Sequence, residues 1–182
     1  MNKFLQLAWE LLKIGAIALL IVIPIRYFVF QPFVVRGASM EPNFTDFDYL
    51  IINEISYKFE TPKRGDVIVF NSPMTPSQRF IKRVIGLPGE TVKIQQNEIN
   101  ISTPEKTTTL NESAYLPSSL VTSNSNAVTL GLDEYFVLGD NRPYSYDSRY
   151  FGAIKRNTII GKVALKFGFG GIFAKNVLQP AK

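Results

Sequence analysis

The chain has 182 residues, of which 46% are hydrophobic, so it is long enough and apolar enough to bury the core of one domain. It contains no histidine and no cysteine, which excludes disulfides, thiolate or imidazole metal sites, and catalysis by Ser-His-Asp or Cys-His groups. A net charge of +5 at pH 7 admits nucleic acid or anionic lipid as partners, but the positive residues are scattered in short pairs such as Lys63-Arg64. This pattern indicates a mildly basic, solvated surface.

An apolar run near the N-terminus predicts a helix long enough to cross a bilayer. The run from Leu11 to Phe30 has twenty residues, roughly 30 Å as a helix. Lys13 and Arg26 bound its most apolar part, and aromatic residues lie at both ends, as is typical of a membrane anchor. A cleaved signal peptide and a buried helix are the alternatives. We expect residues 1–30 to be a retained anchor with a span at about residues 11–30, whose orientation the flanking charges do not decide.

From Gln31 onward the sequence predicts a mainly β domain. Short runs rich in Val, Ile, Phe and Tyr, bounded by Gly, Pro or Asn, are typical of strands. They lie at residues 47–55, 66–70, 80–85, 135–138 and 158–167. Residues 91–101 alternate apolar with polar around Gln96-Asn97, which predicts a hairpin. The absence of a βαβ rhythm favours closely spaced strands of a mainly β fold.

The segment 102–132 differs in composition from its surroundings. It is rich in Ser, Thr and Asn and poor in long apolar runs, which indicates an inserted surface lobe. We expect this lobe to lie outside the active site. The β core is then residues 31–101 and 133–167, and residues 168–182 form a C-terminal tail. The apolar start of the tail could contact lipid or pack back onto the β domain.

Ser39 is a candidate nucleophile in the sequence Arg-Gly-Ala-Ser-Met-Glu-Pro at residues 36–42. Gly37 permits backbone angles that other residues avoid, and Pro42 fixes its own. Most serines in turns only satisfy local hydrogen bonds, so Ser39 alone is weak evidence. Because the chain lacks histidine and cysteine, a serine nucleophile would need a different base.

Residues 79–86 place two cations inside an apolar strand. Because side chains alternate, Lys82 shares a face with Phe80 and Val84, while Arg83 lies on the other face. One of the two cations must therefore sit against the core. A buried lysine has a lowered pKa and can serve as a base. The alternative is that both are edge-strand charges that discourage aggregation.

The loop after residues 135–138 is dense in polar groups. It carries two Asp, two Arg, two Ser and one Asn within ten residues. Such a loop can be purely structural, with its acids and guanidinium groups paired. If the segment is extended, Ser145, Asp147 and Arg149 fall on one side, so one face could supply a hydroxyl and an ion pair together.

Four motifs in this order resemble bacterial type I signal peptidase, a serine–lysine peptidase of the S26 family. They are Gly37-x-Ser39-Met40-x-Pro42, Gly65-Asp66-Val67, Arg79-Phe80-x-Lys82-Arg83-x-x-Gly86-x-Pro88-Gly89 and Gly139-Asp140-Asn141-Arg142-x-x-Ser145-x-Asp147-Ser148-Arg149. The link Phe30-Gln31-Pro32-Phe33 fits as well. The resemblance covers residues 26–166, interrupted by residues 102–132.

The resemblance implies that Ser39 is the nucleophile and Lys82 its general base. Ser145 would hydrogen-bond and orient the Lys82 amine, and the backbone N–H of Ser39 would donate to the oxyanion. Some family members carry a serine, a second oxyanion donor, at the position of Gly37, so the second donor stays open here. Supporting roles are implied for Met40, which would help line the site, and for Arg83, Asp140, Asp147 and Arg149.

The implied activity is that of a membrane-anchored endopeptidase. It would remove signal peptides from secreted preproteins after small residues at −3 and −1, on the exoplasmic side of the cytoplasmic membrane. The implied fold is a mainly antiparallel β domain of coiled sheets beside one N-terminal transmembrane helix. Signal peptides and the lipid bilayer are the implied partners, and no metal, organic cofactor or nucleic acid is implied.

Two other functions stay open. One is a related serine–lysine self-cleaving repressor, although those proteins carry a DNA-binding head where this chain has an apolar run. The other is a catalytically idle relative that binds peptides. One departure from the family pattern is Asn43, which stands where threonine usually follows the proline.

Overall fold

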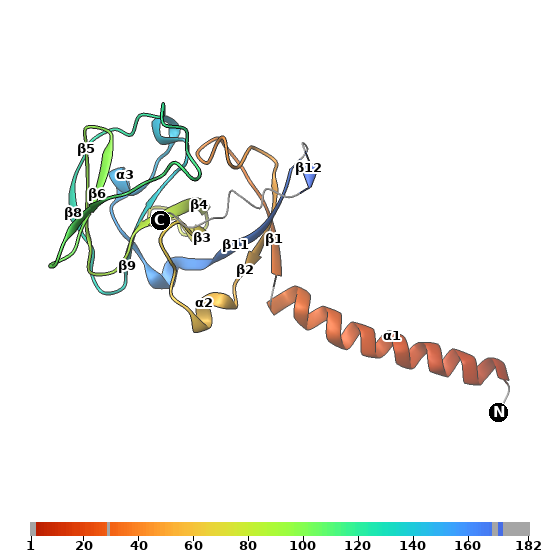
Figure 1. Ribbon diagram of the computed structural model, residues 1–182. Helices are drawn as coiled ribbons and strands as arrows, with labels where there is room; N and C mark the ends of the chain where they lie inside the picture. Colours follow the sequence, from red (N-terminus) through yellow and green to blue (C-terminus); the bar gives the residue numbers. More distant parts are fainter. Residues whose placement is uncertain (1–2, 29, 169–170, 173–182) are drawn as a thin grey trace.

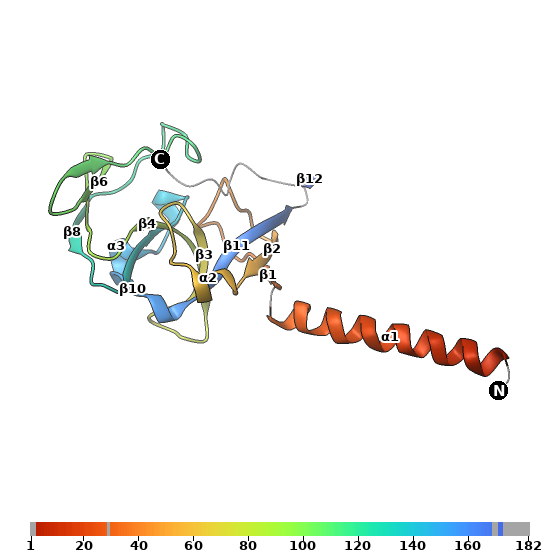
Figure 2. The ribbon, with the colours of Figure 1, turned by 60° about the horizontal axis from the view of Figure 1, so that its bottom comes forward.

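The computed structural model describes residues 3–28, 30–168 and 171–172 as one long helix and a β domain (Figure 1). The helix is α1 (Lys3–Phe28), which extends away from the domain in both ribbon views (Figure 2). The strands are β1 (Phe30–Val34), β2 (Tyr49–Asn53), β3 (Val67–Asn71), β4 (Arg79–Gly86), β5 (Thr91–Gln95), β6 (Glu98–Ser102), β7 (Thr107–Thr109), β8 (Ser125–Thr129), β9 (Glu134–Leu138), β10 (Ile154–Lys155), β11 (Ile159–Gly168) and β12 (Gly171–Ile172). The short helical turns are α2 (Ser56–Phe59), η1 (Arg142–Tyr144), α3 (Ser148–Phe151) and η2 (Arg156–Thr158).

The strands of the described residues form two antiparallel sheets. The larger has eight strands in the order β1-β2-β11-β3-β4-β9-β10, with β12 paired to β11. The smaller has four strands in the order β7-β6-β5-β8. Strand β4 therefore lies in the middle of the large sheet, between β3 and β9.

The N-terminal helix begins earlier than the predicted one and ends at Phe28. The apolar side chains that the structure describes on this helix are exposed, as Leu12 and Leu20 illustrate at 63% and 75% of their accessible surface. Among the residues that the structure describes, no helix combines the length and the apolar character needed to cross a membrane. The helix is thus confirmed, whereas the predicted transmembrane span at residues 11–30 is not supported.

The five predicted strand runs correspond to β2, β3, β4, β9 and β11. The predicted hairpin is β5–β6, and its two turn residues Gln96 and Asn97 have φ angles of 51° and 66°. Positive φ at both central positions is what a tight two-residue hairpin turn requires. Strand β1 was not predicted, because Pro32 interrupts its pattern. Proline is tolerated there since β1 lies at the edge of the sheet.

The small sheet differs from the predicted boundary of the inserted lobe. The hairpin β5–β6 was assigned to the core, but it pairs with β8 and β7 from the polar segment. The second sheet therefore starts at Thr91 rather than at residue 102. Of the predicted tail, Gly168 ends β11 and residues 171–172 pair back onto that strand, while residues 169–170 and 173–182 lie outside the described residues.

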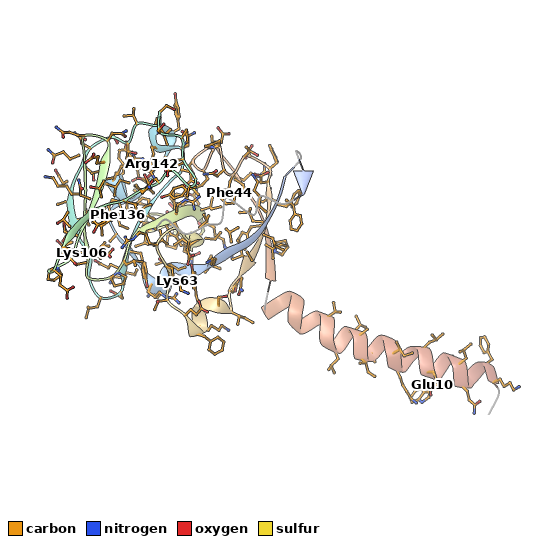
Figure 3. The ribbon with its side chains drawn as sticks, in the orientation of Figure 1. Glu10, Phe44, Lys63, Lys106, Phe136 and Arg142 are labelled. Carbon is orange, nitrogen blue, oxygen red and sulfur yellow. The ribbon has the colours of Figure 1, made fainter. Side chains whose placement is uncertain are left out.

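Three apolar clusters among the described residues hold the domain together. One packs Met40 and Phe44 against β2, β3 and β11, directly under the turn that carries Ser39. Another lies between the two sheets and includes the fully buried Phe136, which Figure 3 labels together with Phe44. Fully burying such a side chain contributes about 1.5–3 kcal/mol, so these clusters fix the sheets and the turns between them.

Candidate active site

Strand β4 carries both predicted cations into the interior. Lys82 is 4% exposed and Arg83 is 0% exposed. The interpretation as edge-strand charges is wrong, because β4 is flanked by β3 and β9. Lys82 lies on the same face as Phe80, whose ring centroid is 5.6 Å from the lysine Nζ. Arg83 lies on the opposite face and pairs with Asp140.

The Ser39 turn is held by the loop that follows β9. The backbone N–H of Asn141 donates to the carbonyl of Ser39 at 3.1 Å, and its side-chain amide donates to the carbonyl of Ala38 at 3.0 Å. Gly37 has a φ of +88°, a conformation that glycine adopts readily. Its N–H donates to Asp46 Oδ1 at 2.8 Å. The serine is thereby presented on a fixed bend.

Ser39 and Lys82 meet in space although they are 43 positions apart. Lys82 Nζ lies 2.6 Å from Ser39 Oγ and 3.0 Å from the carbonyl of Ile81. Burial lowers the pKa of Lys82 to about 8, and the carboxylates of Asp147 and Asp140 oppose part of this effect. The pair can therefore exchange a proton near neutral pH: the ammonium donates to the hydroxyl oxygen, and the neutral amine accepts from the hydroxyl.

A cleft of about 410 Å³ opens beside this pair. Its lining includes the apolar side chains of Phe33, Val35 and Leu50. Arg36 and Arg79 also line it. The cleft can thus receive an extended apolar segment next to the Ser39 hydroxyl.

The polar loop after β9 is organised around Asp147. Its carboxylate accepts from the backbone N–H of Gly139 at 3.0 Å and from Arg149 Nε and Nη2 at 2.8 and 2.9 Å. The same carboxylate caps α3 by accepting from the N–H of Arg149. Asp147 is 0% and Arg149 3% exposed in their side chains, so this pair is a buried brace for the loop.

Ser145 lies in the loop but does not make the hydrogen bond that the family resemblance implies. Its Oγ is buried and has no hydrogen-bond partner among the described residues. Lys82 Nζ instead contacts Ser39 Oγ and the carbonyl of Ile81. A buried hydroxyl without a partner is unusual and marks a site that can still form a bond.

Met40 occupies a different place from the expected one. It is 0% exposed, packs in the core and accepts a 3.4 Å contact from the N–H of Asp140 on its sulfur. The described residues that line the cleft do not include Met40. Met40 therefore stabilises the Ser39 turn by packing in the core next to it.

Several side chains at the site were not predicted from the sequence. Asn43 donates through one amide nitrogen to Asp140 Oδ2 at 2.7 Å and to the carbonyl of Tyr115 at 2.8 Å. Glu112 pairs with Arg142 at 2.5 Å. The inserted lobe therefore contacts the loop after β9, although the described residues that line the cleft include none from the lobe. The signal available in the sequence was the apolar pair Tyr115-Leu116 within an otherwise polar segment, close to an isolated acid.

Comparison with known proteins decides the family. The model of the family described as "Signal peptidase, peptidase S26" matches residues 8–168. The chain belongs to this signal peptidase family. The resemblance inferred from the four motifs is thereby confirmed, and the protein is a serine peptidase.

Named relatives agree with this assignment. A probable signal peptidase I-2 of Synechocystis sp. is 36% identical over 163 residues, which cover 87% of this chain and 72% of the relative. Signal peptidase I V of Bacillus subtilis is 35% identical over 161 residues, 82% of this chain and 93% of the relative. A crystal structure of a signal peptidase I from Enterococcus faecalis is 35% identical, with a TM-score of 0.48, and the match covers 57% of this chain and 97% of that chain.

Proposed function

We propose that this signal peptidase family member hydrolyses the bond after the signal peptide of secreted preproteins, with Ser39 as nucleophile and Lys82 as general base. The observation that carries the proposal is the 2.6 Å separation of Ser39 Oγ and Lys82 Nζ. Burial of that lysine, with its pKa lowered to about 8, makes the neutral amine accessible near neutral pH. No metal or organic cofactor enters the reaction.

In the first half of the reaction, Ser39 Oγ attacks the carbonyl carbon of the scissile bond and its proton passes to Lys82 Nζ. The carbonyl oxygen becomes an oxyanion. The backbone N–H of Ser39, which donates to no acceptor among the described residues, is available to stabilise it. Lys82 then gives its proton to the leaving amine, the C–N bond breaks, and the signal peptide remains as an ester on Ser39.

In the second half, Lys82 is neutral again and accepts a proton from water. The resulting hydroxide attacks the ester carbonyl, the C–O bond to Ser39 breaks, and the proton returns to the serine oxygen. Ser145, whose buried hydroxyl has no partner among the described residues, orients the lysine amine when the two come into contact during turnover. The brace formed by Asp147 and Arg149 keeps Ser145 near the reacting atoms.

Gly37 has no side-chain hydroxyl that could be the second oxyanion donor, and its backbone N–H already donates to Asp46 Oδ1. The substrate occupies the cleft beside Ser39 as an extended segment. Its residues at −3 and −1 are small, as the resemblance to type I signal peptidases implies. The apolar walls contributed by Phe33, Val35 and Leu50 suit small apolar side chains.

The peptidase is attached to the cytoplasmic membrane by α1, with the β domain on the exoplasmic side. Support comes from the exposed apolar side chains along α1, such as Leu12, Ile17 and Leu20, which are 63%, 61% and 75% exposed. Substituting these three by glutamate should release the protein from vesicles of bacterial lipid in a flotation assay. Retention on the vesicles would contradict lipid attachment through α1.

The decisive test uses the purified full chain in detergent with a preprotein as substrate. We expect cleavage at a single site after a small residue, lost in Ser39→Ala. Lys82→Arg should be as inactive as Lys82→Ala, because arginine keeps the charge but does not deprotonate. An active Lys82→Arg variant would refute the serine–lysine mechanism. Absence of cleavage by the unchanged chain would favour the idle peptide-binding alternative.

A further inference from the structure

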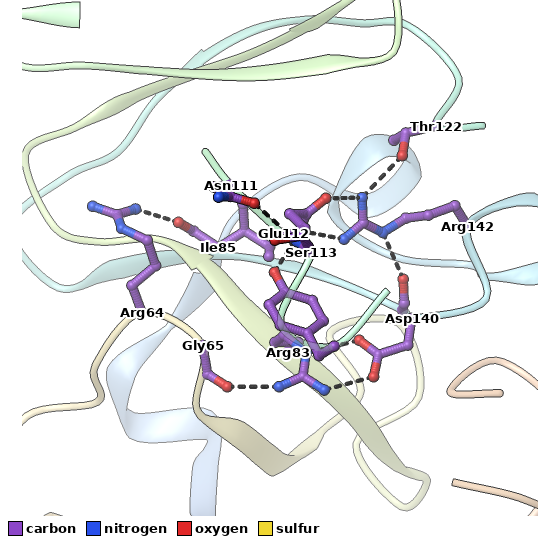
Figure 4. A network of polar contacts seen from close by, with 12 residues as sticks. Arg64, Gly65, Arg83, Ile85, Asn111, Glu112, Ser113, Thr122, Asp140 and Arg142 are labelled. Atoms are coloured by element: carbon purple, nitrogen blue, oxygen red, sulfur yellow. Dashed lines mark hydrogen bonds and ion pairs between the residues drawn. The ribbon is translucent and has the colours of Figure 1, made fainter. Parts of the chain in front are cut away.

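The inserted lobe contacts the loop after β9 through a largely buried ion pair. The two carboxylate oxygens of Glu112 accept from the two terminal nitrogens of Arg142 at 2.5 and 2.7 Å (Figure 4). The side chain of Arg142 is 1% exposed and that of Glu112 is 16% exposed. Thr122, also from the lobe, accepts from Arg142 at 2.9 Å. Two parallel bonds fix the orientation of the guanidinium as well as its distance.

Arg142 connects the ion pair with Glu112 to the rest of the loop. Its Nε donates to the carbonyl of Gly139 at 2.9 Å, and its own carbonyl accepts from Arg149 Nη2 at 2.7 Å. The lobe also contacts Arg149 directly, since Ser123 Oγ accepts from Arg149 Nη1 at 2.9 Å. Both ends of the loop are therefore tied to side chains of the lobe, and Arg149 connects them to Asp147.

Tyr115 links the lobe to the other two segments that carry the reactive side chains. Its ring centroid lies 4.0 Å from the guanidinium carbon of Arg83, the neighbour of Lys82 on β4. Its carbonyl accepts from Asn43, which follows the nucleophile turn. Its hydroxyl donates to Glu112 at 2.5 Å. The lobe thus contacts the nucleophile turn, the base strand and the loop at once.

We propose that Glu112 is a positioning residue of the peptidase reaction: through Arg142 it holds the loop 139–149 in register with Ser39 and Lys82. This inference rests on the proposed function and assigns to the inserted lobe a part in it. Glu112 does not touch the substrate or the reacting atoms; it acts through the arginine that it binds.

The route from Glu112 to the reacting atoms is short. A Cβ on Gly139 would lie 2.4 Å from the carbonyl oxygen of Ser39 and 2.1 Å from Ser145 Oγ, so the loop backbone is in close contact with both. The N–H of Asn141 also holds the Ser39 carbonyl. A shift of the loop therefore shifts the nucleophile. Misplacement by about 1 Å can lower a rate about a hundredfold.

Glu112→Gln tests this in the full chain, because glutamine keeps the size and an acceptor oxygen but loses the charge. We expect kcat to fall about 10- to 100-fold and KM to change much less than kcat, since Glu112 does not line the cleft and the loop contributes Tyr144 and Tyr146 to its lining. Thr122→Val, which removes one bond to Arg142 and leaves the ion pair, should lower kcat by about threefold. If Glu112→Gln folds poorly, Thr122→Val still tests the proposal, because it weakens the contact between the lobe and Arg142 without removing the ion pair.

Glu90→Gln is the matched control. Glu90 pairs with Arg64 at 2.6 Å, with side-chain exposures of 12% and 21%, and Arg64 also donates to the carbonyl of Ile85. This pair likewise joins the second sheet to β4 but touches no residue of the nucleophile turn or the loop 139–149. We expect a loss of Tm similar to that of Glu112→Gln, with kcat within about twofold of the unchanged protein.

The outcomes separate a positioning role from a purely structural one. If Glu112→Gln keeps kcat within about twofold, or if Glu90→Gln loses as much kcat at equal loss of Tm, the inference is overturned. Ser39→Ala distinguishes failure of the proposed function from failure of the role assigned to Glu112. If Ser39→Ala cleaves as fast as the unchanged chain, the proposed function fails. If Ser39→Ala is inactive and Glu112→Gln is fully active, only the role of Glu112 fails.

Discussion

Arg83 and Asp140 form an ion pair that is 0% exposed on both sides, one residue along β4 from Lys82. Arg83 Nε and Nη2 donate to the two carboxylate oxygens at 2.8 and 2.6 Å. The pair joins the strand of the base to the loop whose Asn141 holds the Ser39 turn. A full guanidinium charge can be buried there because its carboxylate partner is buried with it.

Asp140→Asn should therefore be strongly destabilising. Asparagine keeps the shape but removes the charge that compensates Arg83, and breaking one side of a buried ion pair costs about 3–5 kcal/mol. The free energy of unfolding from chemical denaturation checks this value. Glu60→Gln is the control, because Glu60 pairs with Lys63 at 3.4 Å with side chains 61% and 68% exposed, and such pairs contribute little. Equal stability of the two variants would contradict the prediction.

Lys82→Met should stabilise the fold while it abolishes cleavage. The lysine pKa falls from 10.5 to about 8 on folding, so near pH 7 the folded state carries an unfavourable buried ammonium worth about 3 kcal/mol. Because the unfolded chain binds the proton more tightly, the stability of the unchanged protein rises with pH between about 8 and 10.5. The stability difference between the two proteins should shrink across this window. Unfolding curves at pH 7, 9 and 10.5 measure it, and a pH-independent difference would contradict it.

The rate of cleavage should rise with pH along a limb centred near pH 8, because only the neutral amine of Lys82 can accept the serine proton. The carboxylates of Asp147 and Asp140 raise this pKa against the effect of burial. Asp140→Asn should accordingly shift the limb to lower pH, provided that kcat/KM is measured below its reduced Tm. A limb near pH 10, as for a solvated lysine, would exclude Lys82 as the base.

Gly139→Ala should lose most of its activity. The new methyl group would lie 2.1 Å from Ser145 Oγ and 2.4 Å from the Ser39 carbonyl oxygen, so the loop and the nucleophile turn must separate. Gly131→Ala is a fair comparison, because its nearest contact is the mobile end of the Glu134 side chain at 3.3 Å. We expect kcat/KM to fall at least about tenfold for the first variant and to change less than about twofold for the second. Similar activities would show that the close approach of Gly139 is not needed.

The sequence alone determined the features that depend on neighbouring residues. The alternation of residues 79–86 placed Lys82 and Arg83 on opposite faces of a strand, and Gln96-Asn97 marked the hairpin turn that the φ angles confirm. The four motifs identified the family, which the family comparison confirms. These signals are readable because strand alternation and turn chemistry act over a few consecutive residues.

Only the tertiary structure decided which distant groups meet. It placed Lys82 in a central strand with both cations buried, where the local pattern could not separate a core strand from an edge. It also brought Asn43 to Asp140 across 97 positions and Glu112 to Arg142 across 30. Such contacts depend on how two sheets pack, and a polar segment gives no periodic signal of the partner that it will cover. Burial then sets the pKa of the lysine, because desolvation is a property of the assembled core and not of the residue itself.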